Sequence, residues 1–164
     1  MNVADVMTSE LSACLPSEPL MRAARIMWEQ DCGCVPVVDG DAKPVGMITD
    51  RDVCMAAYTT AGRLDDYPVE RAMARPAWSC RPTDPLAAAH ELMRLHQVRR
   101  LLVTDDEGRL VGLLALSDLT QRALPRADAK ERTGQMAELV ETLGEVTRPR
   151  RSLKYRAACL LTST

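Results

Sequence analysis

The chain of 164 residues has no phenylalanine, and aromatic residues make up only 3% of it. A buried core therefore has to consist of Val, Leu, Ile, Met and Ala, within an apolar share of 46%. No run approaches 18 consecutive apolar residues, so no membrane-spanning helix is expected. The net charge of −2 gives no basic excess, which makes nucleic acid an unlikely class of partner.

No secretory signal is expected, because the residues MNVADVMTSE contain neither a basic nor an apolar stretch. We therefore expect a cytoplasmic protein whose six cysteines are reduced and act as small apolar side chains. Cys32 and Cys34 are the one close pair, and no second Cys or His pair completes a zinc site. No metal is expected, while oxidation of this Cys-Gly-Cys segment stays open as an alternative.

The chain contains an internal repeat, which appears when the sequence is shifted against itself by 66 residues without a gap. Residues 3–57 then align with residues 69–123. The identical pairs include Val3/Val69, Met7/Met73, Cys14/Cys80, Pro16/Pro82, Pro19/Pro85, Leu20/Leu86, Ala23/Ala89, Met27/Met93, Val37/Val103, Asp39/Asp105, Val45/Val111, Gly46/Gly112 and Asp52/Asp118. So many matches in one register predict two copies of one structural unit.

Each unit reads as strand–helix–strand–strand–helix. Ser17-Glu-Pro and Thr83-Asp-Pro predict helix starts, and the helices are expected to run to about Gln30 and His96. Two apolar runs then flank a turn, which predicts a hairpin, and a helix follows from Asp50 and from Ser117. The predicted fold class is α/β (α+β), with two tandem units packed sheet to sheet around a pseudo-two-fold axis and sharing one core.

The predicted organisation is a first repeat over 1–58, a linker over 59–68, a second repeat over 69–124 and a C-terminal helix and basic tail over 125–164. The last segment has eight Lys/Arg and five Asp/Glu, which gives it a net charge of +3. Met136, Leu139, Val140 and Leu143 have helical spacing and predict a helix that docks through them. The basic stretch beginning at Arg148 is interpreted as a solvated tail.

Two equivalent segments, Gly46 to Asp52 and Gly112 to Asp118, place a glycine in a strand and an acid in the first turn of the next helix. A glycine within a strand indicates that something approaches the backbone closely. An acid at this place can bind the two hydroxyls of a ribose, but Thr49 and Asp52 also fit a capping box that needs no ligand. Because Ala115 replaces the hydroxyl of that box in the second repeat, ligand binding is favoured for Asp118.

Adjacent cations, Arg99 and Arg100, precede a strand of the second repeat and are candidates for binding a phosphate. Their equivalents Gly33 and Cys34 carry no charge, so the two halves are expected to differ chemically. His90 and His96 fall on one predicted helix, and no nucleophile–base arrangement is recognisable. We therefore expect no enzymatic activity.

The paired Gly-Met-Ile-Thr-Asp-Arg-Asp and Gly-Leu-Leu-Ala-Leu-Ser-Asp segments, together with the stretch from Gln97 to Val103, resemble a cystathionine-β-synthase (CBS) domain pair, also called a Bateman module. The resemblance covers about residues 1–124 and is strongest with short, stand-alone bacterial proteins of this family. It implies a regulatory module that binds AMP, ADP, ATP or S-adenosylmethionine in clefts between the repeats, requires no cofactor and forms homodimers, with a further protein partner unidentified.

Carried over to this sequence, the resemblance implies two ligand sites. In one cleft Asp118 and Ser117 would hold a ribose, Arg99 and Arg100 would meet phosphates, and Cys14, Val35 and Pro36 would face the adenine. In the other cleft Asp52, Thr49 and Arg51 would surround the ribose and Cys80 would lie beside the adenine. The first cleft is expected to take the charged nucleotide, and the second a less anionic adenosyl ligand. Two further hypotheses are a ligand-free structural or adaptor homodimer, and a thiol redox or metal sensor based on Cys32 and Cys34.

Overall fold

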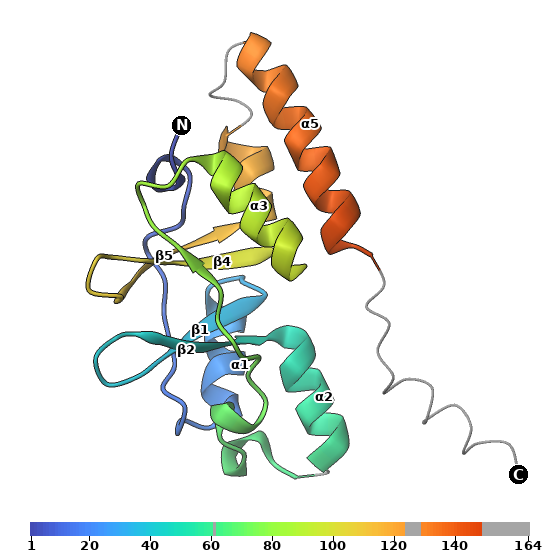
Figure 1. Ribbon diagram of the computed structural model, residues 1–164. Coiled ribbons are helices and arrows are strands. Elements are labelled where there is room, and N and C mark those ends of the chain that lie inside the picture. Colours follow the sequence, from blue (N-terminus) through green and yellow to red (C-terminus); the bar gives the residue numbers. More distant parts are fainter. Residues whose placement is uncertain (61, 124–128, 149–164) are drawn as a thin grey trace, which may run out of the picture.

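The computed structural model describes residues 1–60, 62–123 and 129–148 and has a mixed α and β architecture (Figure 1). Its first repeat consists of η1 (Val3–Asp5), α1 (Leu20–Glu29), β1 (Cys34–Val38), β2 (Pro44–Thr49) and α2 (Asp50–Thr60), with η2 (Leu64–Asp66) after it. Its second repeat consists of η3 (Val69–Arg71), β3 (Ser79–Cys80), α3 (Leu86–His96), β4 (Arg100–Thr104), β5 (Leu110–Ala115), α4 (Leu116–Asp118) and the π-helical turn η4 (Leu119–Ala123). A long helix, α5 (Ala129–Val146), follows. The predicted fold class is confirmed.

The two β-hairpins repeat each other in register. Val37 of β1 faces Gly46 of β2, and the equivalent Val103 of β4 faces Gly112 of β5. The second repeat adds β3 parallel to β4, whereas the first has a single bridge between Cys14 and Val37 at the same place. Figure 1 shows both hairpins in the middle of the molecule, with α1 and α3 on opposite outer sides.

Helices α1 and α3 begin two residues later than the sequence predicts. Ser17 is not a cap, because Pro19 and Pro85 take the N-cap positions without a side-chain hydrogen bond. Glu18 instead accepts a hydrogen bond from the backbone of Leu15 at 2.8 Å, and the equivalent Asp84 accepts one from Arg81 at 2.8 Å. These residues therefore stabilise the turn before each helix.

The repeats exchange their opening segments. Val3 and Val6 are buried in the core of the second repeat, while Val69 and Met73 are buried in the core of the first. Backbone bonds hold both exchanges, including Val3 N–H to the Asp84 carbonyl at 2.9 Å and Val69 N–H to the Glu18 carbonyl at 2.8 Å. The predicted single shared core is therefore wrong, since the buried residues form two clusters that each combine both repeats.

This exchange explains the two strand glycines. A Cβ at Gly46 would lie 2.6 Å from Met73 Sδ and 3.1 Å from the carbonyl of Ala74. A Cβ at Gly112 would meet Met7 Sδ at 2.7 Å and the Thr8 carbonyl at 3.1 Å. The close approach that the sequence predicts is therefore made by the chain itself at the crossing segments.

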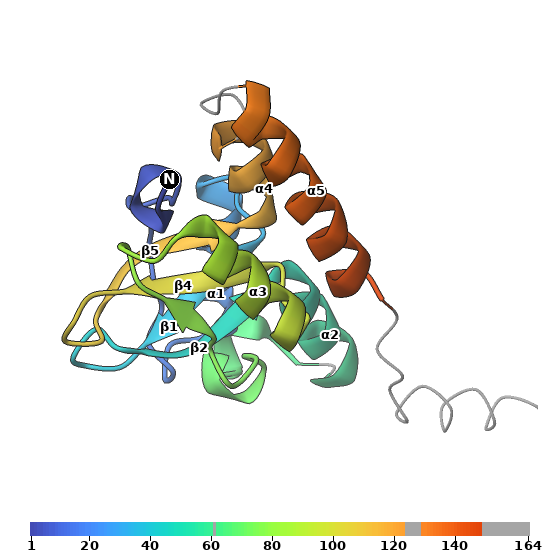
Figure 2. The ribbon, with the colours of Figure 1, turned by 45° about the horizontal axis from the view of Figure 1, so that its top comes forward.

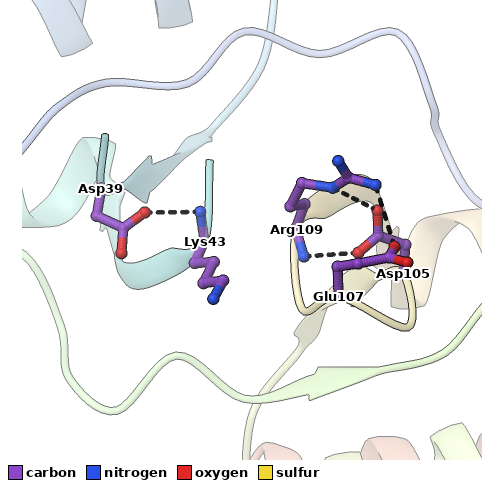
Figure 3. Close-up of polar contacts among 5 residues, drawn as sticks. All are labelled: Asp39, Lys43, Asp105, Glu107 and Arg109. Atoms are coloured by element: carbon purple, nitrogen blue, oxygen red, sulfur yellow. Dashed lines mark hydrogen bonds and ion pairs between the residues drawn. The ribbon is translucent and has the colours of Figure 1, made fainter. Parts of the chain in front are cut away.

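The hairpin turns are also equivalent and touch each other. Asp39 accepts the backbone N–H of Lys43 at 2.9 Å, and Asp105 accepts that of Arg109 at 2.8 Å (Figure 3). In the second turn Arg109 adds ion pairs to Asp105 at 2.8 Å and Glu107 at 3.0 Å. The Ala42 carbonyl accepts the N–H of Leu110 at 2.9 Å, which ties one turn to the other repeat.

Helix α5 lies along α3 on the outer side of the second repeat (Figures 1 and 2). Leu139, Thr142 and Val146 are buried there. The predicted helix is present, but of its four predicted docking residues only Leu139 is buried, because Met136, Val140 and Leu143 are exposed. Among the residues that the structure describes, no helix combines the length and apolar character needed to cross a bilayer.

Candidate functional site

Two open pockets contain residues from the hairpins of both repeats. The larger, here called the Asp118 pocket, has a volume of about 800 Å³. It is lined by Thr8, Glu10, Leu11, Ser12, Gln30, Asp31, Cys32, Gly33, Cys34, Pro36, Arg100, Leu113, Ala115, Ser117 and Asp118. The second, here called the Thr49 pocket, has a volume of about 630 Å³. It is lined by Met47, Thr49, Arg51, Ala74, Pro76, Ala77, Trp78, Gln97, Val98, Arg99, Arg100, Val146, Thr147 and Arg148.

In the Asp118 pocket, the short helix after β5 supplies Asp118 and Ser117, and the start of β4 supplies Arg100. Pro36 of β1 completes the group of sequence-predicted residues that this pocket contains. The structure therefore brings together four of the seven residues that the sequence assigns to this cleft.

Asp118 is 8% exposed, and its carboxylate is held from two sides. One oxygen accepts the backbone N–H of Ala115 at 2.7 Å, and the other lies 3.8 Å from Arg122 Nε. Arg122 also donates to the carbonyls of Val6 and Met7 at 3.3 and 3.0 Å. Asp118 therefore caps its helix even though Ala115 has no hydroxyl, so the missing hydroxyl does not distinguish a ligand from a cap.

Asp52 has the same cap in its complete form. Its Oδ2 accepts the N–H and the hydroxyl of Thr49 at 2.9 and 2.6 Å, and Thr49 Oγ1 accepts the Asp52 N–H at 3.3 Å. Thr49 and Arg51 line the pocket, whereas Asp52 is not among its lining residues. The carboxylate is engaged in the capping box that the sequence leaves open as the alternative.

The arginines are distributed differently from the expectation. Arg99 lines the Thr49 pocket and not the Asp118 pocket, while Arg100 lines both. Adjacent residues at a strand entrance point to opposite sides, which separates the two guanidinium groups. Gly33 and Cys34, which the sequence places without a cation at the equivalent strand entrance, line the Asp118 pocket and not the Thr49 pocket.

Three predicted adenine-facing residues line neither pocket. Cys14, Val35 and Cys80 are 1%, 0% and 5% exposed and belong to the cores beneath the hairpins. Burial raises the pKa of Cys14 to about 11 and that of Cys80 to about 12, and the nearby carboxylates Glu18 and Asp84 add to these shifts. Both thiols are therefore neutral, packed side chains.

Sequence reasoning missed the aromatic wall of the Thr49 pocket. Trp78 is 36% exposed and stacks on His96, with ring centroids 3.4 Å apart and planes 8° from parallel. Its neighbours in the pocket include the apolar side chains of Met47, Pro76 and Val98. Trp78, next to a predicted strand, is the signal in the sequence that could have indicated this wall. The comparison of the repeats does not mark it, because Ser12 occupies the equivalent position.

The cysteines show little of the chemistry of a redox site. Cys32 Sγ lies 3.4 Å from the Cys34 carbonyl, and both thiols are free. Burial is the main cause that raises the pKa of Cys34, with Arg100 opposing it. In the part of the chain that the structure describes, no three His, Cys, Asp or Glu side chains are grouped so as to hold a metal ion. Cys159 lies outside the described residues.

The sequence profile of the CBS domain matches residues 3–58 and 69–124. The CBS domain-containing protein YhcV of Bacillus subtilis (strain 168) is 34% identical over 128 residues, which make up 78% of this chain and 89% of YhcV. The crystal structure of CBSX2 in complex with AMP has 27% identity and a TM-score of 0.65, covering 76% of this chain and 96% of CBSX2. The CBS domain pair of protein MJ0100, in complex with 5′-methylthioadenosine and S-adenosyl-L-methionine, has 23% identity and a TM-score of 0.65, covering 74% and 98%.

Proposed function

The chain belongs to the CBS domain family as a tandem pair of repeats, and on that premise we propose that it is a regulatory module that binds adenosine nucleotides between the repeats. The proposal includes no catalysis by this chain. AMP is bound by CBSX2, and S-adenosyl-L-methionine by the domain pair of MJ0100, so the ligand class is the adenosyl group.

The Thr49 pocket is the site we assign to a phosphate-bearing nucleotide, and its charge is the observation that carries the proposal. Arg51, Arg99, Arg100 and Arg148 line it, and none of its described lining residues is acidic. Guanidinium groups bind phosphate through paired, charge-assisted hydrogen bonds. Trp78 offers an aromatic wall for the adenine ring, because offset stacking on tryptophan suits a flat π system.

The Asp118 pocket suits a less anionic adenosyl ligand. Glu10, Asp31 and Asp118 line it, with Arg100 as the lining cation. A carboxylate-rich wall repels a polyphosphate but accepts ribose hydroxyls and a sulfonium such as that of S-adenosylmethionine. This assignment reverses the expectation from sequence, which gave both Arg99 and Arg100 to the Asp118 cleft, because Arg99 lines the Thr49 pocket instead.

Isothermal titration calorimetry with AMP, ADP, ATP and S-adenosylmethionine tests the assignment. We expect Arg99→Gln to weaken the binding of AMP and ATP by at least about tenfold, since each charge-assisted hydrogen bond contributes about 1.5–3 kcal/mol. The exposed side chain of Arg99 makes this variant safe for the fold.

Asp118→Asn is the matched control for the other pocket, since its amide oxygen can still accept the Ala115 N–H. It should leave the affinities for AMP and ATP within about twofold of the wild-type values and should weaken the binding of S-adenosylmethionine. Absence of heat for all four ligands, at protein concentrations that detect millimolar binding, would contradict the proposed function.

We also propose a cytoplasmic homodimer, and an unidentified protein partner that reads the bound state. The outer face of the first repeat supports self-association, because Trp28 and Tyr58 are 88% and 81% exposed. The same face supports the second candidate, a ligand-free adaptor, which the titrations above distinguish. A thiol sensor has weaker support, because the raised pKa of Cys34 keeps its reactive thiolate form scarce.

A further inference from the structure

Helix α5 lies outside both repeats, yet its C-terminal end forms part of the Thr49 pocket. The CBS match ends at residue 124, whereas Val146, Thr147 and Arg148 line this pocket together with Thr49 and Arg99. Arg148 adds a cation and pairs with Glu145 at 2.7 Å. Among the described residues of α5, none lines the Asp118 pocket. Of the two pockets, the C-terminal end of α5 and the residues directly after it therefore contribute to the Thr49 pocket alone.

A buried polar contact holds α5 on the second repeat. Thr142 is fully buried, and its hydroxyl lies 2.8 Å from His90 Nδ1 of α3. The same hydroxyl accepts a hydrogen bond from Arg94 at 3.3 Å and donates one to the Glu138 carbonyl at 2.8 Å. Leu139 and Val146 pack into the core on either side of this contact along the helix.

The docking contact and the pocket wall are joined by the end of α5: the N–H groups of Thr147 and Arg148, which follow the helix directly, donate to the carbonyls of Leu143 at 3.1 Å and Glu145 at 3.2 Å. Val146 follows Thr142 by one turn, a rise of about 6 Å along the helix axis. Movement of Thr142 away from His90 would therefore carry Val146, Thr147 and Arg148 away from the Thr49 pocket. A ligand that touches both walls binds the docked arrangement more tightly than the undocked one.

We propose that α5 completes the nucleotide site: Arg148 binds phosphate of the ligand in the Thr49 pocket, and Thr142 is a positioning residue that holds Arg148 there through His90. The inference rests on the proposed function. Because linkage is reciprocal, nucleotide in this pocket also holds α5 on α3, which makes the helix the element that reports occupancy.

Calorimetric titration of the full chain with ATP and with adenosine tests the inference. Arg148→Gln and Thr142→Val should each weaken the binding of ATP by about fivefold or more, because coupling between linked sites typically changes an affinity by at least that factor. Adenosine, which has no phosphate, should keep its affinity in Arg148→Gln. Thr133→Val is the matched control, because Thr133 is exposed on the same helix and should bind ATP as the wild type does.

Two further readouts separate positioning from a general structural effect. In the Arg148→Gln background, Thr142→Val should cause no additional loss of ATP affinity, because the group that it positions is gone. At an ATP concentration that saturates the wild type but not Arg99→Gln, ATP should also slow hydrogen exchange of α5 amides more in the wild type than in Arg99→Gln. Wild-type ATP affinity in both Arg148→Gln and Thr142→Val would overturn the inference and leave nucleotide binding intact. Absence of ATP binding by the wild type would overturn both.

Discussion

At the scale of single residues, the hairpin turns offer a direct comparison between the repeats. Ala42 has the left-handed backbone conformation at φ 62°, and its equivalent in the second repeat is Gly108 at φ 79°. A left-handed conformation costs a residue with a Cβ about 1–2 kcal/mol, whereas glycine adopts it freely but loses about 0.5–1 kcal/mol through greater entropy in the unfolded chain. We expect Ala42→Gly to raise the free energy of unfolding by about 0.5–1 kcal/mol, measured by urea denaturation.

Gly40 of the same turn provides the control. A Cβ there would meet no atom within 4 Å, and its φ lies outside the left-handed region. Gly40→Ala should therefore leave stability within about 0.5 kcal/mol or raise it slightly. Equal stability of Ala42→Gly and the wild type would show that the turn tolerates alanine without strain.

Residue identity in the sequence predicts chemistry better than placement. The sequence marks Arg99 and Arg100 as candidates for binding phosphate and assigns both to one cleft. It does not predict that Arg99 lines the Thr49 pocket, because that depends on how the two hairpins face each other. Cys14 and Cys80 are also placed differently from the expectation. The resemblance implies that they lie beside a ligand, but in the structure both are buried in the cores.

At the scale of elements, the contact between α3 and α5 is sensitive to pH. Burial lowers the pKa of His90 below 6.5, Glu138 opposes this shift and Arg94 adds to it, while Glu141 pairs with Arg94 at 3.7 Å. The unfolded chain therefore takes up a proton at a higher pH than the folded one, so stability is present above about pH 6.5 and is lost as the pH falls below it. We expect the wild type to lose more stability between pH 7.5 and 5.5 than His90→Gln does.

Urea denaturation at the two pH values measures that difference. The two proteins differ only at residue 90, so the comparison reports the effect of His90. ATP affinity should fall over the same interval in the wild type, because acid weakens the docking of α5. An identical loss of stability in both proteins would show that His90 does not couple to protonation.

Helix α5 also shows why element existence is easier to predict than orientation. The spacing of Met136, Leu139, Val140 and Leu143 indicates the helix correctly, but of these four only Leu139 is buried. The docked face includes Thr142, whose hydroxyl contacts His90. Such a polar contact cannot be predicted from the spacing of apolar residues along the helix.

At the scale of the whole molecule, α5 makes the two outer faces unequal. Arg94 on α3 is held by Thr142 and Glu141, whereas the equivalent position on α1 is Trp28, whose side chain is exposed. Burying a tryptophan removes about 150–250 Å² of surface from water, which favours pairing of two copies through the first repeat. We expect sedimentation velocity to show a wild-type dimer and a weakened dimer for Trp28→Glu.

Leu95→Glu is the control for that experiment, because Leu95 is 71% exposed on α3 of the second repeat. It should sediment as the wild type does. A monomeric wild type at tens of micromolar, or an unchanged dimer for Trp28→Glu, would contradict the assignment of this face.

The overall plan follows from the sequence because the repeat determines it. The 66-residue shift predicts equal hairpins, and the pairs Val37–Gly46 and Val103–Gly112 occur in the same register. The exchange of opening segments is not predictable from the same pattern. Val3 and Val69 are identical, so each matches both cores, and only the path of the connecting chain decides which core it enters.

That exchange has a consequence for how the protein is made. The core around Leu20 and Ile48 lacks Val69 and Met73 until the ribosome has released residues well past the first repeat. Val3 and Val6 are synthesised long before their core partners Leu86, Leu101 and Leu114. The first core can therefore form only after Met73 has been synthesised, and Val3 and Val6 stay without their core partners until most of the second repeat has followed.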